Sequence, residues 1–264
     1  MTHRIHNILV LLVLVSAVVL SVSAQTLEEI DTELSNIYLT IDRYGSYGGE
    51  YDEEKLAAGN AAMINALKKY GGREDVLGHK LPKASDAIFI ATSKDGNLRT
   101  YSWDASDGGT MHNFYVVYQY RGKDGKARVL TPDDDDNSGG SFVSEMFEMK
   151  TTSGPIYLLI SNAILSTSLN TQSIKAMRIN GSQLEKRANV IRTKEGLTNT
   201  VGFEFDFFSV VDRPERPVKL FQFDEKRKEF RFPVVIESDK FIQGEVTKRF
   251  IKYRFNGKEF VNVR

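Results

Sequence analysis

Apolar side chains recur at helical spacing in two consecutive segments near the N-terminus. In residues 26–44 the apolar positions follow one another at intervals of three or four and share one face of a helix: Leu27, Ile30, Leu34, Ile37, Ile41 and Tyr44. Thr26 and Glu29 form the capping-box pattern that starts a helix. A second stripe, over residues 52–70, begins with acidic side chains and ends at two glycines. We therefore predict an N-terminal two-helix hairpin.

The pattern changes at Ala87, where apolar and polar positions begin to alternate with the period of a β-strand. Turn sequences rich in glycine and asparagine separate the alternating segments: residues 94–97, 123–126, 180–181, 224–228 and 256–257. No segment of helix length lies between them, although a parallel crossover would need one. The predicted fold is mainly β: an antiparallel meander that forms a curved sheet, a barrel or a sandwich after the two helices.

No linker rich in proline or serine interrupts residues 25–264. We therefore predict that these residues form a single β-rich domain that includes the two N-terminal helices. The alternative is a pair of β subdomains that part near residues 193–199.

Residues 1–24 have the pattern of a secretory signal peptide. A short segment carrying Arg4 precedes the apolar stretch Ile8–Leu20, and the small residues Val22 and Ala24 occupy the positions that a signal peptidase reads. At 1.5 Å per residue the apolar stretch covers about 20 Å, less than the roughly 30 Å of a membrane's hydrocarbon core. We expect cleavage of this segment and no transmembrane helix in the mature chain.

The chain of 264 residues contains no cysteine, which excludes lipid attachment through cysteine, cysteine proteases and redox dithiols. A secreted eukaryotic domain of this size would commonly carry disulfides. We accordingly expect a bacterial protein that a Sec-type signal directs to the periplasm or the medium, and not a lipoprotein. The 35 basic and 35 acidic side chains balance, so charge gives no reason to expect nucleic acid or anionic lipid as a partner.

Residues 98–112 contain the only tryptophan and one of the two histidines that follow the signal segment. On a strand, Tyr101 and Trp103 point to the same face, where aromatic rings can bind a ligand. A Gly-Gly connection can fold His112 back toward Asp104, which would bring an acid–base pair together. The alternative is that His112 is a structural histidine at the start of a strand.

The same part of the chain resembles a known signature. Residues 94–104 read Lys-Asp-Gly-Asn-Leu-Arg-Thr-Tyr-Ser-Trp-Asp, and residues 108–112 read Gly-Gly-Thr-Met-His. These two strings are similar to a signature of an uncharacterised family of exported bacterial proteins. The resemblance implies a bacterial, exported, β-rich protein, and it implies no activity because none is established for that family.

An acidic segment follows the second predicted hairpin. Four of its residues stand where an EF-hand loop places oxygen ligands: Asp134, Asp136, Ser138 and Glu145. Gly139 stands at the position of the sharp turn, but the sequence before the segment is strand-like and lacks the entering helix. We therefore predict no cofactor, with calcium at this segment as the one candidate. The alternative is a solvated acidic hairpin tip.

Another candidate site is the carboxylate pair Glu204 and Asp206, which alternates with phenylalanines. On one strand face the two carboxylates would lie about 7 Å apart, a separation that glycoside hydrolysis uses. The alternative is a half-buried strand with its phenylalanines inward and its acids in water.

The sequence contains no P-loop, no dinucleotide-binding glycine motif and no Gly-x-Ser-x-Gly. We therefore expect an exported bacterial β-rich binding or envelope-associated protein without an evident catalytic set, whose ligand is an unknown envelope or extracellular molecule. The alternative is a secreted hydrolase that uses Asp104 and His112, or Glu204 and Asp206.

Overall fold

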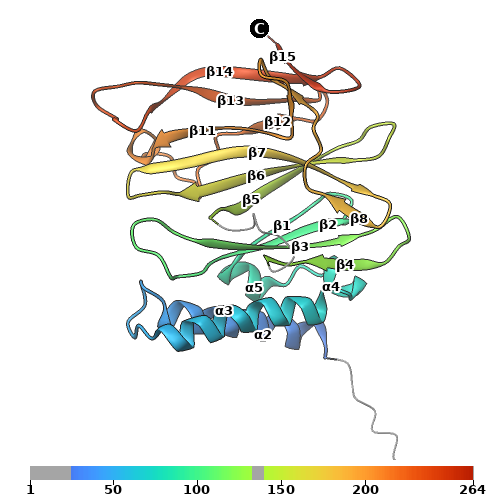
Figure 1. The fold of residues 1–264 in the computed structure, drawn as a ribbon, viewed down its shortest axis with the longest axis vertical. Coiled ribbons are helices and arrows are strands. Elements are labelled where there is room, and N and C mark those ends of the chain that lie inside the picture. The colour runs from blue at the N-terminus through green and yellow to red at the C-terminus, as the bar shows by residue number, and fades with distance from the viewer. Residues whose placement is uncertain (1–24, 133–139, 264) are drawn as a thin grey trace, which may run out of the picture.

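The computed structural model describes residues 25–132 and 140–263. A layer of helices and three β-sheets are stacked along the long axis (Figure 1). The layers follow the chain from its N-terminal to its C-terminal part, except that residues 200–206 return to the middle sheet after two short strands of the outer sheet. The mainly β, antiparallel fold with N-terminal helices, which the sequence predicts, is confirmed. Among the predicted forms, the structure is a layered sandwich.

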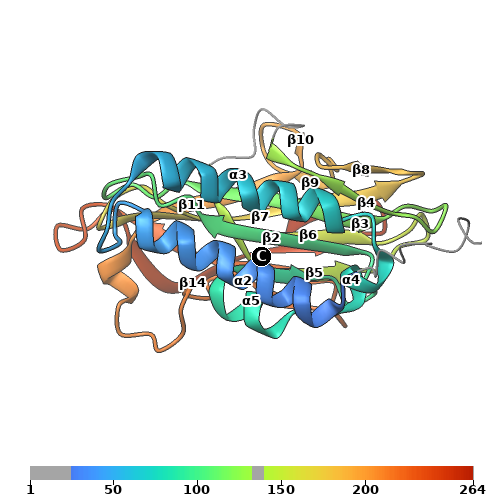
Figure 2. The same ribbon diagram turned by 90° about the horizontal axis from the view of Figure 1, so that it is seen from below.

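The helix layer consists of α2 (Leu27–Tyr44) and α3 (Glu53–Tyr70). The side chain of Thr26 accepts the backbone N–H of Glu29, and the carboxylate of Glu29 accepts the N–H of Thr26, so the capping box forms as predicted. Both helices lie across the same face of the first sheet (Figure 2). In the described part of the chain no helix is long and apolar enough to cross a membrane.

Two short helices and the first sheet come next: α4 (Glu74–Gly78), α5 (Pro82–Ala87), β1 (Phe89–Thr92), β2 (Leu98–Asp104), β3 (Phe114–Arg121) and β4 (Ala127–Leu130). The four strands pair antiparallel in chain order. The alternating pattern predicts that a strand begins at Ala87. In the structure, Ala87 is the last residue of α5. This short helix begins at Pro82, because proline is well suited to the first turn of a helix.

The middle sheet has the strand order β11-β7-β6-β5, with β8 paired to β7. Its strands are β5 (Phe142–Met149), β6 (Ile156–Ile164), β7 (Leu169–Asn180), β8 (Gln183–Glu185) and β11 (Thr200–Asp206). A single 3-10 turn, η2 (Phe207–Val210), follows β11.

The outer sheet has the order β10-β9-β15-β14-β13-β12. Its strands are β9 (Ile191–Arg192), β10 (Leu197–Thr198), β12 (Gln222–Asp224), β13 (Glu229–Ile236), β14 (Glu245–Phe255) and β15 (Phe260–Val263). The short β9 pairs parallel with β15, and the other described pairs of this sheet are antiparallel.

Each pair of neighbouring layers encloses its own apolar core. Tyr101 and Trp103 of β2 pack beneath the helices, whereas Leu98 of the same strand packs against the middle sheet. β6 is buried on both of its faces, because Tyr157 packs against the first sheet and Leu158 against the outer sheet. A strand that is covered on both faces is apolar at successive positions instead of alternate ones.

Candidate functional site

The loop between β2 and β3 folds His112 back onto Asp104, as the Gly-Gly connection allows. Nδ1 of the imidazole lies 2.5 Å from Oδ2 of Asp104. The other carboxylate oxygen accepts the backbone N–H of Ser106 at 2.9 Å, which fixes the carboxylate. His112 and Asp104 keep 26% and 16% of their side chains exposed, so the pair lies at the edge of the fold rather than in its core.

A tyrosine that the sequence did not single out covers the imidazole. Tyr47, from the loop after α2, stacks on His112 with ring centroids 4.7 Å apart and an angle of 17° between the ring planes. Its hydroxyl donates to the carbonyl of Gly109, which ties this loop to the β2–β3 loop. Burial, together with the negative charge of Asp104, raises the pKa of Tyr47. The same two effects, with Asp42, raise the pKa of Tyr38 to about 12, so both phenols stay neutral at physiological pH.

His112 and Tyr47 line one side of a cavity of about 410 Å³. Residues of the β6–β7 turn and Phe207 of η2 also line this cavity. Nε2 of His112 has no hydrogen-bond partner among the described residues, although Nδ1 is bonded to Asp104. The imidazole can therefore offer Nε2 to a bound molecule, as donor or acceptor according to its tautomer.

A second cavity, of about 340 Å³, adjoins the first one. The two cavities share three lining residues, Ile164, Asn170 and Phe207. Most of the residues that line the second cavity are apolar and come from several segments, among them Phe89, Phe142, Ala163, Phe205 and Val218. We call the two adjoining cavities the end cleft, because the loops and turns that form much of it lie at one end of the sheet stack, on the left in Figure 1.

A buried amide binds two of the residues that line the apolar cavity, Asn162 and Val218. Gln172 of β7 is 1% exposed, and its Nε2 donates to the side chain of Asn162 and to the carbonyl of Val218. Its Oε1 accepts the backbone N–H groups of Leu220 and Phe221 at 3.0 and 3.1 Å. These bonds hold the segment before β12 against the middle sheet, so the apolar cavity is preorganised.

Arg216 places a positive charge at the rim of the apolar cavity. Its guanidinium donates to the carbonyls of Val211, Arg213 and Glu215 in its own loop. The guanidinium also lies 5.3 Å from the ring centroid of Phe207. Arg216 therefore stabilises the loop that closes this side of the end cleft.

The cleft contains an acid–base pair without an assembled nucleophile. Ser166 lies in the same cavity as His112, but its Oγ accepts the backbone N–H groups of Ser168 and Leu169 and so stabilises the β6–β7 turn. Among the described residues, the one side chain hydrogen-bonded to the His112 ring is Asp104. The arrangement can hydrogen-bond a ligand, and it can accept a proton from water.

The predicted aromatic binding pair lies elsewhere. Tyr101 and Trp103 are each 1% exposed and belong to the core beneath the helices. Tyr101 donates its hydroxyl to Gln119, and Trp103 donates its indole N–H to Asn60. Both polar groups are used inside the fold, so these two aromatic residues position the helix layer and do not face a ligand.

The structure also separates the second carboxylate pair from the end cleft. Glu204 is exposed, whereas Asp206 is buried and accepts the N–H of Phe208 at 2.9 Å to start η2. Neither carboxylate lines either cavity of the cleft. The buried position of Asp206 also differs from the alternative in which both acids face water.

Three of the four predicted calcium ligands, Asp134, Asp136 and Ser138, lie outside the described residues. The fourth, Glu145, lies on β5 with its Oε1 3.5 Å from Nζ of Lys219. Within residues 25–132 and 140–263, no three histidine or acidic side chains gather in a group that could hold a metal ion. Calcium stays a prediction, and thermal unfolding with calcium and with a chelator tests it.

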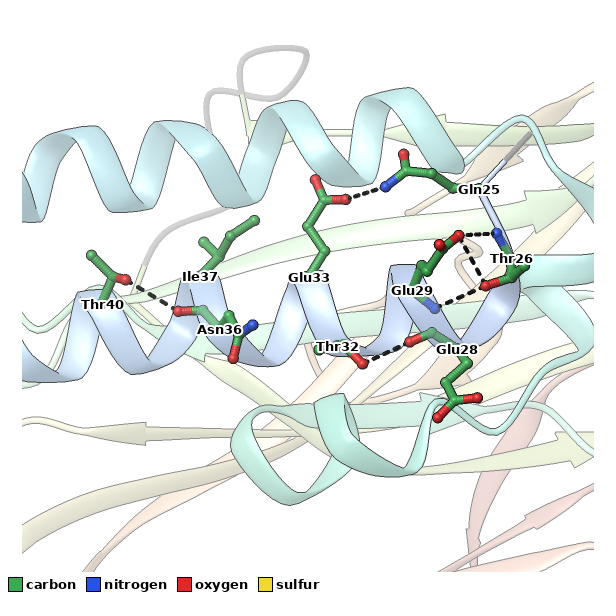
Figure 3. Close-up of a pocket in the computed structure, with 9 residues that line it drawn as sticks. All are labelled: Gln25, Thr26, Glu28, Glu29, Thr32, Glu33, Asn36, Ile37 and Thr40. Atoms are coloured by element: carbon green, nitrogen blue, oxygen red, sulfur yellow. Dashed lines mark hydrogen bonds between the residues drawn. The ribbon is translucent and has the colours of Figure 1, made fainter. Parts of the chain in front are cut away.

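A broad hollow also lies on the outer face of α2 (Figure 3). Glu33 accepts a hydrogen bond from Gln25, and the hydroxyl of Thr32 donates to the carbonyl of Glu28. These contacts, with the capping box, are those of an ordinary helix surface. The end cleft, by contrast, brings together residues from seven parts of the chain.

No family model, curated protein or solved structure matches the chain in comparisons with known proteins. The resemblance of residues 94–112 to an exported bacterial family therefore stays an expectation. The case for a function rests on the end cleft.

Proposed function

We propose that the protein binds a small, largely apolar molecule in the end cleft and acts without catalysis. The observation that carries this proposal is the junction of the two cavities, one walled mainly by phenylalanine and aliphatic side chains and the other by His112, Tyr47 and hydroxyl-bearing residues. Concave, mostly apolar cavities with few polar groups are typical of small-molecule sites.

The two cavities define the chemistry of the ligand. Its apolar part fits the cavity beside Phe142 and Phe205, where most of the lining is apolar and few groups can form hydrogen bonds. Its polar part extends to Nε2 of His112, whose direction is fixed by the Asp104 carboxylate. We therefore propose an amphipathic molecule that carries one hydrogen-bonding group, met in the periplasm or the medium of a bacterium.

Binding of N-phenyl-1-naphthylamine tests this proposal, because the dye is apolar, carries one N–H and fluoresces when shielded from water. We expect saturable fluorescence with the wild type and a strong loss with Ala163→Phe, which fills the apolar cavity. Thr171→Phe, from a half-buried position in the same wall, is a second blocking variant. Ala61→Phe on the exposed side of α3 is the matched control and should bind as the wild type does.

Circular dichroism and thermal unfolding establish that each variant is folded. The proposal fails if the wild type binds no dye, or if both blocking variants fold and bind it with unchanged affinity.

The Asp104–His112 pair favours ester hydrolysis as a second candidate function. In that reaction Nε2 of His112 accepts a proton from water as the water oxygen attacks the ester carbonyl, and the proton then passes to the leaving alcohol. The Asp104 carboxylate stabilises the imidazolium that forms. Hydrolysis of p-nitrophenyl butyrate should then be abolished by His112→Ala and kept by His79→Ala, which replaces the other histidine of residues 25–264.

Export is the remaining part of the proposal, and residues 1–24 support it by their sequence pattern. Expression of the full chain in a Gram-negative host should yield a product shortened by this segment in the periplasm. A full-length product in the cytoplasm would contradict export and leave the binding proposal to its own test.

A further inference from the structure

Asn170 of β7 lies where the two cavities of the end cleft adjoin. It is the one polar residue among the three described residues that line both cavities, and the other two are Ile164 and Phe207. Across the sheet, Asn170 pairs with Ile164 on β6 and with Phe205 on β11, which also lines the cleft. The side-chain amide of Asn170 is therefore a polar group at a junction whose other shared residues are apolar.

This amide has no hydrogen bond to any described residue, and Asn170 is half-buried. The other described asparagine of the cleft differs, because Asn162 donates to Ser144 and accepts from Gln172. Arg216 likewise donates to three carbonyls of its own loop. An amide that loses water without gaining a partner in the fold is unfavourable. A ligand in the cleft can supply that partner.

The charges around the cleft favour a negatively charged partner. None of the described residues that line the two cavities carries a carboxylate, and Arg216 places a positive charge at the rim. Asp104 lies beside the cleft, but its two oxygens are occupied by the backbone N–H of Ser106 and by Nδ1 of His112. A negative ligand is therefore attracted to the cleft, and a positive ligand finds no acid in the described lining.

His112 can bind the same negatively charged group. With Asp104 at Nδ1 and a second carboxylate at Nε2, the imidazole would hold a proton on both nitrogens, because each carboxylate stabilises the charged ring. Nε2 then donates to the ligand, as does Nδ2 of Asn170. Charge-assisted hydrogen bonds are about twice as strong as neutral ones, so a hydroxyl in the same place would bind more weakly.

We propose that the ligand of the end cleft is a long-chain carboxylic acid, whose carboxylate is bound by Asn170 and His112 and whose alkyl chain lies in the apolar cavity. This inference rests on the proposed function, because it names the class of molecule that the cleft binds. Asn170 determines the preference for the carboxylate, whereas the apolar lining binds an alkyl chain with any head group.

Displacement of N-phenyl-1-naphthylamine from the whole protein tests the proposal. The competitors are dodecanoate, dodecanol and dodecylamine, which share one alkyl chain and differ in the head group, each used below the concentration at which it forms micelles. We expect dodecanoate to displace the dye at a concentration about tenfold or more below that of dodecanol, since the carboxylate gains charge-assisted hydrogen bonds. Dodecylamine should be the weakest competitor.

Two variants of Asn170 assign this preference to the residue. Asn170→Leu should still bind the dye and should lose most of the preference for dodecanoate over dodecanol. Asn170→Asp places a carboxylate at the junction, so dodecylamine should displace the dye better than dodecanoate does. Asn36→Asp, which adds the same charge at an exposed position of α2, is the matched control and should keep the order of the wild type. Circular dichroism establishes that each variant is folded.

The outcomes separate this inference from the proposed function. A wild type that binds no dye contradicts the proposed function, and the inference fails with it. If the wild type binds the dye but the three head groups displace it equally well, the function stands and the carboxylic acid is overturned as the ligand class. That comparison needs no variant. A folded Asn170→Asp that still prefers dodecanoate would overturn the role of Asn170.

Discussion

Trp103 on β2 donates its indole N–H to the side-chain oxygen of Asn60 on α3, with 2.9 Å between the two atoms. The amide group of Asn60 in turn donates to the carbonyls of Leu56 and Ala105. Asn60 therefore joins the helix layer to the first sheet through both its side-chain oxygen and its side-chain nitrogen. The tryptophan of the signature-like segment is thus a structural residue.

Replacing Asn60 by leucine should lower the free energy of unfolding by about 1–3 kcal/mol, because it leaves the buried indole N–H without an acceptor. Urea denaturation followed by tryptophan fluorescence measures the change, since Trp103 is the only tryptophan. Asn36→Leu, at an exposed position of α2, is the control and should stay close to the wild type. Equal stability of the two variants would contradict the role of this hydrogen bond.

Gly59 should resist the replacement that normally strengthens a helix. Alanine gains about 1 kcal/mol over glycine in a helix interior. In α3, however, a Cβ at Gly59 would lie 3.0 Å from Cγ1 of the buried Ile41 in α2. We expect Gly59→Ala to gain none of that free energy and Gly59→Val to destabilise the protein, as measured by chemical denaturation. In Gly78→Ala, the control, the added Cβ meets no atom within 4 Å, and a stability at or above the wild-type value is expected.

Lys175→Met, at a half-buried position of β7, should raise the midpoint of thermal unfolding at pH 7. Burial lowers the pKa of Lys175 in the folded chain from its ordinary 10.5, so the charged form destabilises the fold. As pH rises through the folded pKa toward 10.5, the unfolded chain binds more protons than the folded chain, and the wild type gains stability.

The advantage of Lys175→Met should therefore narrow as pH rises. A gain of about 1 kcal/mol would appear as about 2–4 °C in a chain of this size. A variant that melts below the wild type at pH 7 would show that the ammonium of Lys175 is stabilised in a way that burial does not describe.

Asp95→Asn should weaken the contact between the first and the middle sheet. Burial opposes the charge of Asp95, but hydrogen bonds from Ser93, Asn97 and Tyr157 outweigh burial and hold the pKa of this carboxyl below its ordinary 3.8. A lowered folded pKa gives stability that is present above about pH 4 and is lost as pH falls through the folded value.

The wild type should therefore unfold at a higher denaturant concentration than Asp95→Asn at pH 6, and the two curves should converge in strong acid. Asp86→Asn, at an exposed position of α5, is the control. A difference that persists unchanged to pH 2 would contradict the assignment.

Much of the fold is predictable because it depends on neighbours in the sequence. Thr26 and Glu29 are three residues apart, and the two faces of β2 follow from its alternation, which places Tyr101 and Leu98 in different cores. The number of layers is harder to predict. The number of layers depends on which sheet faces pack against one another. The continuous apolar sequence of β6 is the one local sign that this strand lies in the middle of the stack.

The candidate site shows the same limit. The glycines between Asp104 and His112 indicate that these side chains can meet, and they do. The stacking of Tyr47 on His112 joins the helix layer to the β2–β3 loop. No local pattern encodes such contacts between distant segments, because alternation gives the face of a strand and not its neighbour in space.

The order of the layers along the chain has a consequence for biogenesis. A nascent polypeptide that has emerged as far as Leu130 already contains both layers that enclose Trp103, so this first unit can condense before the outer strands are synthesised. The other face of the first sheet, which carries Leu98, Val116 and Tyr118, would remain exposed to solvent until β5, β6 and β7 have been synthesised. A ribosome or a translocation pore that stalls in this interval would hold an incomplete chain with an exposed apolar surface, which is prone to aggregation. Chaperones are therefore most needed while the middle sheet is being completed.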